Sequence, residues 1–304
     1  MEKVPEISVV IAAYNHGKYI EETVRSVLKQ TFADLEVIVF DDGSKDDTRE
    51  IIAGIDDKRV KYFYQENSGL PACGRNRGMS LARGKYIALL DGDDTWREDK
   101  LARCREILDE NPGVDLVFHN EAVVYNGKVL RHTSFGPLAD NMYNKLLFKG
   151  NCMHSSAVVL RRKIVFDDGM KYSEDKELFT IEDYDYWMRL SQRYRFHFLP
   201  DSLAFYRVTE TGAFLRSAES NAVNTLKLLD RNFARIDRSQ DGIDAMVRKR
   251  RASVMIAGGR MHHHNRDFRA SRRWYLRAIK EDPMNYKAYV SLAAALLRYR
   301  IVYR

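Results

Sequence analysis

The sequence predicts an α/β fold with a doubly wound, mostly parallel sheet, followed by a C-terminal α-helical extension. Over the first hundred residues, short apolar runs alternate with amphipathic segments, a pattern typical of parallel sheets with helices on both faces. From about residue 215 the pattern becomes helical and basic. A chain of 304 residues is long enough for a large domain and a smaller appendage. We expect these to span residues 1–215 and 216–304.

The strands of the N-terminal half are indicated by continuous β-branched and apolar runs, which are typical of strands buried on both faces. These runs cover residues 7–12, 35–40, 60–64 and 86–90. The segments between them have helical spacing of apolar residues, and we expect helices over 19–30, 47–54 and 70–83. Ligands of open α/β sheets bind beyond the carboxyl ends of the strands. The site is therefore expected at that edge.

The rest of the chain is less regular. Strands are predicted at 114–124 and 155–160, and a helix at 184–194. Within 252–297, two helical segments separated by Asp282 and Pro283 have the rhythm of a tetratricopeptide-type pair. One partial repeat leaves two interpretations open, because such solenoids need about three repeats for stability. The segment is either tetratricopeptide-like or a set of helices packed on the catalytic domain.

Charge is distributed unevenly along the chain. The net charge is +7, but the 74 residues from Arg231 onward have 18 Lys/Arg against 6 Asp/Glu, and the preceding 230 residues have 32 against 37. A basic tail of this kind predicts an anionic partner. We expect an anionic membrane surface, contacted by two arginine-rich groups, or else a simple solvated face. Nucleic-acid binding is not expected, since no recognition motif accompanies the charge. The two groups are Arg248–Arg251 and Arg266, Arg269, Arg272, Arg273 and Arg277.

Compartment is predicted from what the sequence lacks. Its start has no signal-peptide pattern, and no run approaches the roughly 18 apolar residues of a membrane helix. The three cysteines have no metal-ligand spacing and are expected to be reduced thiols. The expectation is a cytoplasmic protein, peripheral on the inner face of the membrane if the basic tail binds lipid.

Two acidic clusters follow predicted strands. Asp41 and Asp42 come directly after the second run and would either form a turn or accept hydrogen bonds from a nucleoside. Asp91, Asp93 and Asp94 come after the fourth run. Like charges this close need a cation or hydrogen bonds to compensate them. Carboxylates suit the hard ions Mn²⁺ and Mg²⁺, so the second cluster predicts a metal that binds a nucleotide diphosphate. The alternative is a solvated acidic turn.

A rival interpretation of the second cluster is a phosphohydrolase. Residues 91–95 also fit the Asp-x-Asp-x-Thr signature of haloacid dehalogenase-type enzymes, with Asp91 as the nucleophile. That hypothesis leaves the first acidic cluster unexplained. A third hypothesis is a non-catalytic scaffold whose helical tail binds a partner.

A third acidic position lies further along the chain. Glu182 and Asp183 precede a predicted helix, where they would either stabilise its first turn or supply a general base that takes a proton from an acceptor hydroxyl. His154 and Trp187 would line an acceptor pocket or pack in the core.

Five motifs together resemble family-2 glycosyltransferases, which have the GT-A fold. They are the opening strand with Tyr14 and Asn15, the two acidic clusters, and the segments 67–69 (Asn-Ser-Gly) and 75–78 (Arg-Asn-Arg-Gly), which occur in the order of that family. Glu182 and Asp183 then fall where that family has its catalytic acid pair. The resemblance covers roughly residues 5–210. Ala12, where many relatives have proline, departs from it.

The resemblance implies an inverting transfer from a nucleotide-diphosphate sugar, with a UDP-sugar favoured, to a hydroxyl of a glycan or lipid-linked acceptor in surface polysaccharide or glycan synthesis. It implies that Mn²⁺ or Mg²⁺ is bound by Asp93 and Asp91, and that Asp183 is the catalytic base. Weaker acceptor candidates are Glu182, Trp187 and His154. The donor would be bound by Ala13, Tyr14, Asp41, Asp42, Asn67, Arg75 and Asp91.

Overall fold

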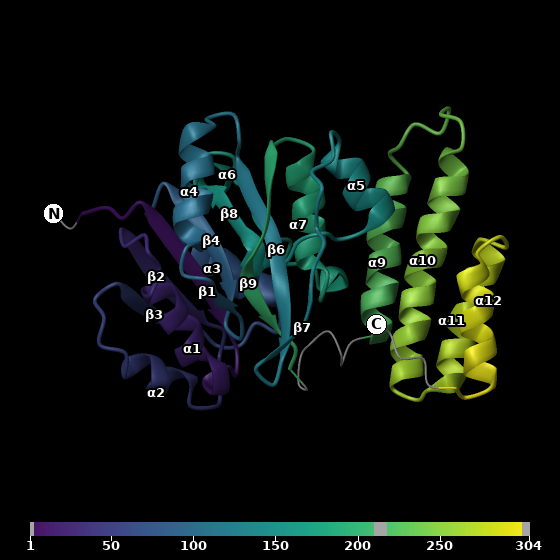
Figure 1. Ribbon diagram of the computed structural model, residues 1–304, viewed down its shortest axis with the longest axis horizontal. Helices are drawn as coiled ribbons and strands as arrows, with labels where there is room; N and C mark the ends of the chain where they lie inside the picture. Colours follow the sequence, from purple (N-terminus) through teal and green to yellow (C-terminus); the bar gives the residue numbers. More distant parts are fainter. Residues whose placement is uncertain (1–2, 210–217, 300–304) are drawn as a thin grey trace. The chain divides into compact units, whose positions relative to one another are not determined.

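A single mixed sheet forms the centre of the N-terminal part of the chain (Figure 1). The computed structural model describes residues 3–209 and 218–299. The strands are β1 Ile7–Ala13, β2 Leu35–Asp41, β3 Val60–Tyr64, β4 Tyr86–Asp91, β5 Thr95–Trp96, β6 Leu116–Tyr125, β7 Lys128–His132, β8 Val158–Arg161 and β9 Phe196–Arg207. Their order is β3-β2-β1-β4-β8-β6-β9-β5, and β7 pairs with β6 at the side.

The first four strands are parallel, as the alternating pattern predicts. In β1, Ala12 lies opposite Asp91 of β4, and Ala13 lies opposite Asp41 of β2. This register places the ends of three strands at one edge, so the residues that follow them lie close together. The predicted fold class is confirmed in this half of the sheet.

Beyond β4 the sheet is mixed. Strand β8 is antiparallel to β4 and β6, whereas β6 and β9 are parallel. The sequence analysis did not predict β5, β7 or β9. Strand β5 has two residues, β7 is exposed along its whole length, and β9 contains Pro200, so each lacks the continuous apolar run of a buried strand.

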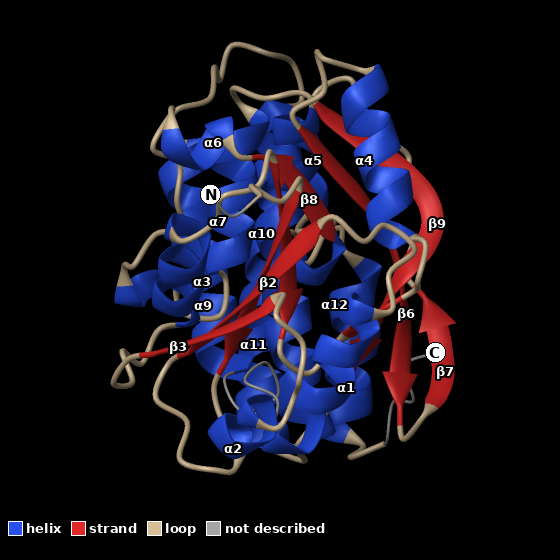
Figure 2. Cartoon of the chain, turned by 90° about the vertical axis from the view of Figure 1, so that its left-hand side faces the viewer, coloured by secondary structure: helices blue, strands red, loops and turns tan. Residues whose placement is uncertain are grey.

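Helices cover both faces of the sheet (Figure 2). Ile7, Val9 and Ile11 of β1 pack against α1 and α4 on one face, while Val10 faces α3 on the other. The alternation follows from the period-2 geometry of a strand. The helices of this part are α1 Gly17–Leu28, α2 Thr48–Ala53, α3 Pro71–Ser80, α4 Lys100–Glu110, α5 Met142–Lys149, α6 Lys163–Phe166 and α7 Glu182–Ser191.

Helix α3 approaches the sheet most closely at a glycine, Gly78. A Cβ atom added at Gly78 would lie 2.5 Å from Cγ1 of Val10, nearer than atoms in proteins pack. One turn earlier, a Cβ at Gly74 would be 3.8 Å from that of Ala12, an ordinary contact. Gly78 thus sets the depth at which Arg75, on the same helix, meets the strand ends.

The C-terminal part is a group of helices, in agreement with the predicted helical extension. They are α9 Ala218–Phe233, α10 Ile243–His264, α11 Phe268–Glu281 and α12 Tyr286–Leu296. Asp267 caps the start of α11, since its carboxylate accepts a hydrogen bond from the Ala270 amide at 2.9 Å. Over the residues the structure describes, no helix has the length and apolarity needed to cross a membrane.

The chain divides into two compact units. The first comprises residues 1–146, 151–174 and 182–209, and the second comprises 147–150, 175–181 and 210–304. The domain boundary predicted between 215 and 216 lies outside the described residues. The tetratricopeptide-like character of the second unit stays a prediction.

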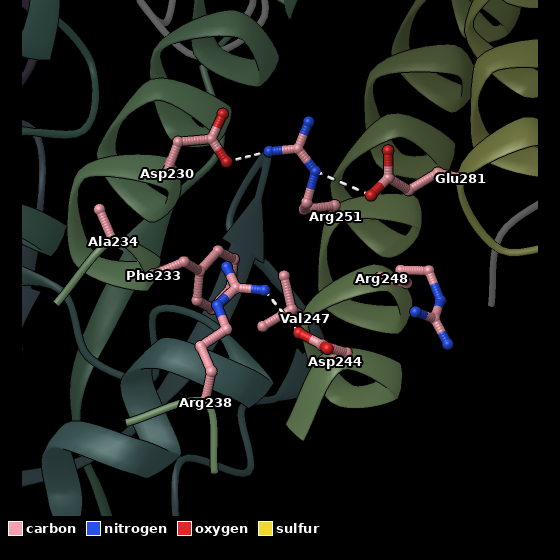
Figure 3. A pocket seen from close by; sticks show the side chains of 9 residues that line it. All are labelled: Asp230, Phe233, Ala234, Arg238, Asp244, Val247, Arg248, Arg251 and Glu281. Atoms are coloured by element: carbon pink, nitrogen blue, oxygen red, sulfur yellow. Dashed lines mark hydrogen bonds and ion pairs between the residues drawn. The ribbon is translucent and has the colours of Figure 1, made fainter. Parts of the chain in front are cut away.

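Ion pairs link three helices of the second unit around a pocket of about 570 Å³ (Figure 3). Arg251 of α10 contacts Asp230 of α9, and its Nε atom is 2.9 Å from Oε1 of Glu281 on α11. Phe233 and Val247 supply apolar lining. The acids therefore neutralise part of the basic character of α10.

The close approach of α3 gives a first prediction. Gly78→Ala should lower the free energy of unfolding by about 1–3 kcal/mol, because the methyl group overpacks Val10. Gly74→Ala in the same helix is the matched control and should be neutral or stabilising by up to about 1 kcal/mol. Urea denaturation measures both. Adding Val10→Ala to Gly78→Ala should cost less than the two single changes summed; additive costs would show that this contact does not set the packing.

Candidate functional site at the carboxyl edge of the sheet

A half-buried arginine joins three elements at the carboxyl edge of the sheet. Arg75 of α3 donates through Nη2 to Oδ1 of Asp91, at the end of β4, and through Nη1 to Oε1 of Glu182, at the start of α7. Both distances are 2.7 Å. Burial alone would lower the pKa of the guanidinium, but the Asp91 and Glu182 carboxylates outweigh it and raise the pKa well above its ordinary value. Arg75 thus fixes α7 to the edge formed by the strands.

The second acidic cluster separates into residues with different surroundings. Asp94 is buried, and its carboxylate accepts hydrogen bonds from the Ser156 hydroxyl at 2.6 Å and from the Arg207 amide at 2.8 Å. Burial, reinforced by the charges of Asp93 and Asp91, raises the pKa of Asp94 well above its ordinary value. Asp94 is therefore a structural residue that holds β9 to the end of β4.

Asp93 has the opposite character. It is half-buried, and within the described residues no other residue donates a hydrogen bond to its carboxylate. Burial raises the pKa of Asp93, with His16 opposing and Asp91 reinforcing that shift. Its oxygens are therefore the least committed in the cluster.

The donor set at this edge suits a hard divalent cation. Both hydrogen bonds from Arg75 go to Oδ1 of Asp91, which leaves Oδ2 with no protein donor in the part of the chain that the structure describes. That oxygen and the Asp93 carboxylate are ligands that Mg²⁺ and Mn²⁺ favour. The described residues contain no group of three or more His, Cys, Asp or Glu placed to hold a metal. The residues fit an ion that takes its other ligands from water and phosphate.

The first acidic cluster is committed to hydrogen bonds within the protein. Asp41 is fully buried and accepts from the Tyr62 hydroxyl and the Ser44 amide, at 2.7 and 2.8 Å. Asp42 accepts from Gln65 and, at 2.7 Å, from the Ser68 hydroxyl. Asp41 thus shapes the turn after β2, and Asp42 ties the segment before α3 to the strand ends.

The other predicted donor-binding residues lie around these turns. The Asn67 amide donates to the backbone oxygen of Asp42 at 2.7 Å, so it supports the loop. Ala13 is buried, and its backbone oxygen accepts from the Asp42 amide at 2.9 Å. Tyr14 is 44% exposed at the same edge, which leaves its ring available to a ligand.

Asp183 directly follows Glu182, whose carboxylate Arg75 binds. Its carboxylate accepts hydrogen bonds from the Asn151 amide group at 3.0 Å and from the Tyr184 backbone amide at 2.6 Å. Burial and the neighbouring Glu182 charge raise the pKa of Asp183 to about 6, although His154 and Arg75 oppose the shift. A carboxylate of this kind is ionised at neutral pH and basic enough to accept a proton.

His154 forms a charged pair with a residue inside the sheet. Its Nδ1 atom is 2.6 Å from Oε2 of Glu121, which is fully buried on β6. Burial disfavours the imidazolium, but the Glu121 carboxylate outweighs burial and raises the pKa of His154 to about 9. The ring packs against Tyr206 and Phe135, with centroids 4.9 and 5.4 Å away.

The structure places Trp187 in the core and not in an acceptor pocket. Its side chain is fully buried and packs against Tyr172 and Tyr186, with ring centroids 6.0 and 5.1 Å away. Trp187 lies about one turn beyond Asp183 on the same side of α7, and Tyr172 and Tyr186 cover it there.

Comparison with known proteins identifies the family. Residues 8–169 match the model described as glycosyl transferase family 2. An uncharacterized glycosyltransferase of Methanocaldococcus jannaschii is 30% identical over 220 residues, which are 69% of this chain and 73% of the relative. The chain belongs to glycosyltransferase family 2.

Other relatives of the family match shorter segments. An uncharacterized glycosyltransferase of a Nostoc species is 32% identical over 168 residues, which are 53% of this chain and 52% of the relative. The succinoglycan biosynthesis protein ExoO of Rhizobium meliloti is 38% identical over 139 residues, 46% of this chain and 40% of ExoO. The match thus spans about half the length of these two relatives.

Solved structures share the fold of this family-2 chain. Staphylococcus aureus TarS, residues 1–349 in complex with UDP, superposes with a TM-score of 0.59 at 23% identity, covering 98% of this chain and 94% of that one. The mannosyltransferase PcManGT of Pyrobaculum calidifontis, with GDP-Man and Mn²⁺, gives 0.60 at 17% identity, covering 98% and 82%. At these identities the likeness shows the fold, and it confirms the predicted fold class.

Four residues of this family-2 site were not predicted. Glu121 is the one signal that the sequence offered, since it is an acid within an otherwise largely apolar strand. His16 precedes α1, Ser156 lies in the turn before β8 and Arg207 ends β9. None of these segments has an acidic motif, and only the fold brings the three residues to the cluster. A Cβ at Gly92 would lie 2.3 Å from Nδ1 of His16, which shows how closely the His16 ring covers this turn.

The Arg75 bridge gives the second prediction. Arg75→Met should lower the free energy of unfolding by about 3 kcal/mol, because Asp91 and the buried Glu182 lose their counter-charge. Adding Glu182→Gln should recover part of that loss, since one unpaired charge is then gone. Thermal or urea unfolding measures the double-mutant cycle. A coupling energy near zero would contradict the bridge.

Proposed function

We propose that this protein is an inverting, metal-dependent glycosyltransferase of hexosyltransferase type that transfers a sugar from a UDP-sugar to an acceptor hydroxyl. The observation that carries the proposal is the position of Asp183. Its basic carboxylate adjoins Glu182, which Arg75 ties to Asp91 at the edge where the acidic cluster leaves an uncommitted carboxylate. The catalytic base, Asp183, would then lie beside the site that binds the nucleotide-sugar donor.

The proposed donor site uses the carboxyl edge of the sheet. Asp93, with Oδ2 of Asp91, would hold Mn²⁺ or Mg²⁺ and thereby the diphosphate. The ion, when bound, supplies positive charge that stabilises a diphosphate leaving group. Tyr14 would contact the nucleoside, and Asp42 and Asn67 would hold the loop on which it rests. Arg75 already binds the carboxylates of Asp91 and Glu182. It would therefore affect the nucleotide indirectly, by holding these two carboxylates in position.

A UDP donor is favoured by a related fold. Structures of TarS 1–349 are described in complex with UDP and with UDP-GlcNAc, whereas PcManGT is described with GDP-Man. Two of these three complexes hold a uridine nucleotide, which supports a UDP-sugar as the donor.

The acceptor side is proposed from Asp183 and its neighbours. Asp183 would take the proton of the acceptor hydroxyl as its oxygen attacks the anomeric carbon on the face opposite the diphosphate, which inverts the configuration. His154, held as an imidazolium by Glu121, would offer a donor to the acceptor or to the departing phosphate. We propose no contact for Trp187.

The acceptor class is proposed from relatives. ExoO is named for succinoglycan biosynthesis, which supports a glycan or lipid-linked acceptor in surface polysaccharide synthesis. We propose a cytoplasmic enzyme that works at the inner face of the membrane, where such acceptors would be presented.

The third prediction concerns the nucleotide. Calorimetry should show that UDP binds with micromolar affinity in the presence of Mn²⁺. Chelation by EDTA and the Asp93→Ala substitution should each weaken that affinity about 10-fold or more, since the diphosphate loses its counter-charge. Asp56→Ala, an exposed carboxylate on another surface, is the control and should bind as the unmodified chain does. If UDP, GDP and dTDP all fail to bind with metal, the transferase proposal loses its basis and a scaffold is favoured.

The fourth prediction concerns pH. The pKa of Asp183 is about 6, so the carboxyl is protonated below that pH and cannot accept a proton. The ratio kcat/KM should therefore rise with pH and level off above about pH 7. Asp183→Asn should reduce kcat by about 10²–10⁴-fold and leave UDP binding intact. An unchanged rate in Asp183→Asn would exclude it as the base.

A further inference from the structure

The last helix of the second unit has its large apolar residues on the outside. Small residues of α12, namely Ala288, Ser291 and Ala295, are the buried ones. Tyr286 and Val290 are 70% and 62% exposed, and Leu297, which follows the helix, is 80% exposed. This is the reverse of an ordinary surface helix, whose large apolar residues face the core. We call the exposed side the α12 apolar stripe; it comprises Tyr286, Tyr289, Val290, Leu296 and Leu297.

The neighbouring helix has a row of cations on its exposed side. We call this row, Arg269, Arg273, Arg277 and Lys280, the α11 basic row; all four are exposed, and their spacing of three to four residues puts them on one side of the helix. Helices α11 and α12 pack against each other, with α12 at the outer edge of the four-helix group (Figure 1). The row and the stripe thus belong to one helical hairpin.

No acidic residue interrupts this surface. Between Phe268 and Tyr299 the sequence has two acids, Glu281 and Asp282, and both are half-buried. Glu281 is paired with Arg251, and Asp282 accepts from Asn285. The hairpin therefore presents apolar side chains and positive charge together, without internal neutralisation.

The other arginine group expected to bind a membrane has different surroundings. Arg251 of α10 lies between Asp230 and Glu281 (Figure 3). Its charge is thereby compensated within the protein, whereas Arg248 and Lys249 of the same group are exposed. The hairpin is the better candidate because it combines exposed cations with an apolar stripe.

We propose that the α11–α12 hairpin docks on an anionic lipid surface. The α12 apolar stripe would enter the headgroup region, and the α11 basic row would lie at the level of the phosphates, which the long arginine stems can reach. A second copy of this chain fits less well, because the exposed part of the hairpin would offer it positive charge and no acid to pair with. The proposal does not depend on the sugar-transfer reaction.

Vesicle co-sedimentation of the full chain tests the proposal. The probes are vesicles of phosphatidylcholine alone and of phosphatidylcholine mixed with phosphatidylglycerol. We expect binding to the anionic vesicles only, weakening as salt is raised. Replacing Arg269, Arg273 and Arg277 by alanine should lower the partition coefficient about 100-fold. Val290→Asp should lower it about 10-fold or more, since a charge then occupies the apolar stripe.

A matched control removes equal charge elsewhere on the same unit. Arg235, Arg248 and Lys249 are exposed and lie outside the hairpin, and their combined replacement by alanine should lower partitioning less than 10-fold. Circular dichroism establishes that each variant is folded. Equal losses in the two triple variants would overturn the proposal, because general charge would then explain binding.

Two further outcomes would also overturn it. One is no binding to anionic vesicles at low salt. The other is a concentration-dependent dimer of the unmodified chain in sedimentation equilibrium that Val290→Asp abolishes while vesicle binding is unchanged; the stripe would then be covered by a second copy. UDP binding measured on the same samples separates failure of this proposal from failure of the proposed function.

Discussion

The compensation of crowded carboxylates is the constraint on which the site depends. Five acids, Asp91, Asp93, Asp94, Glu182 and Asp183, come together through the fold, and such a group is stable only if its charge is paired, hydrogen-bonded or protonated. The Arg75 guanidinium meets this need by contacting Asp91 and Glu182 at once. Gly78 of α3 allows this, because the absence of a side chain there brings the helix close enough to the strands.

That compensation is unequal, and the inequality gives each acid a different chemistry. Asp91 and Glu182 are neutralised by Arg75, while Asp94 is enclosed by hydrogen bonds from Ser156 and Arg207. Asp93 and Asp183 are left without an ion pair among the described residues, and burial raises the pKa of each. A ligand would supply the partner that each of these two acids lacks within the protein. Asp93 would receive a cation, and Asp183 would receive a proton.

Sequence reasoning succeeded where a local pattern determines the structure. The four parallel strands were visible as continuous apolar runs, and both acidic clusters could be placed at their ends. It failed where pairing is non-local: β9 reaches the cluster through Arg207, 113 residues after Asp94, with no motif to signal it. The contacts of Arg75 with Asp91 and Glu182, and the burial of Trp187 in the core, were also not foreseen. Neither the partners of an arginine nor the inward face of α7 can be read from a motif. The roles of the individual site residues stay predictions.

The most direct test of the central claim is a crystal structure of the chain with UDP and Mn²⁺. The account predicts the ion on Asp93 and the diphosphate at the carboxyl edge of β1, β2 and β4, with Arg75 still bound to Asp91 and Glu182. A nucleotide bound away from this edge, or an Arg75 that leaves both carboxylates to bind phosphate, would contradict it.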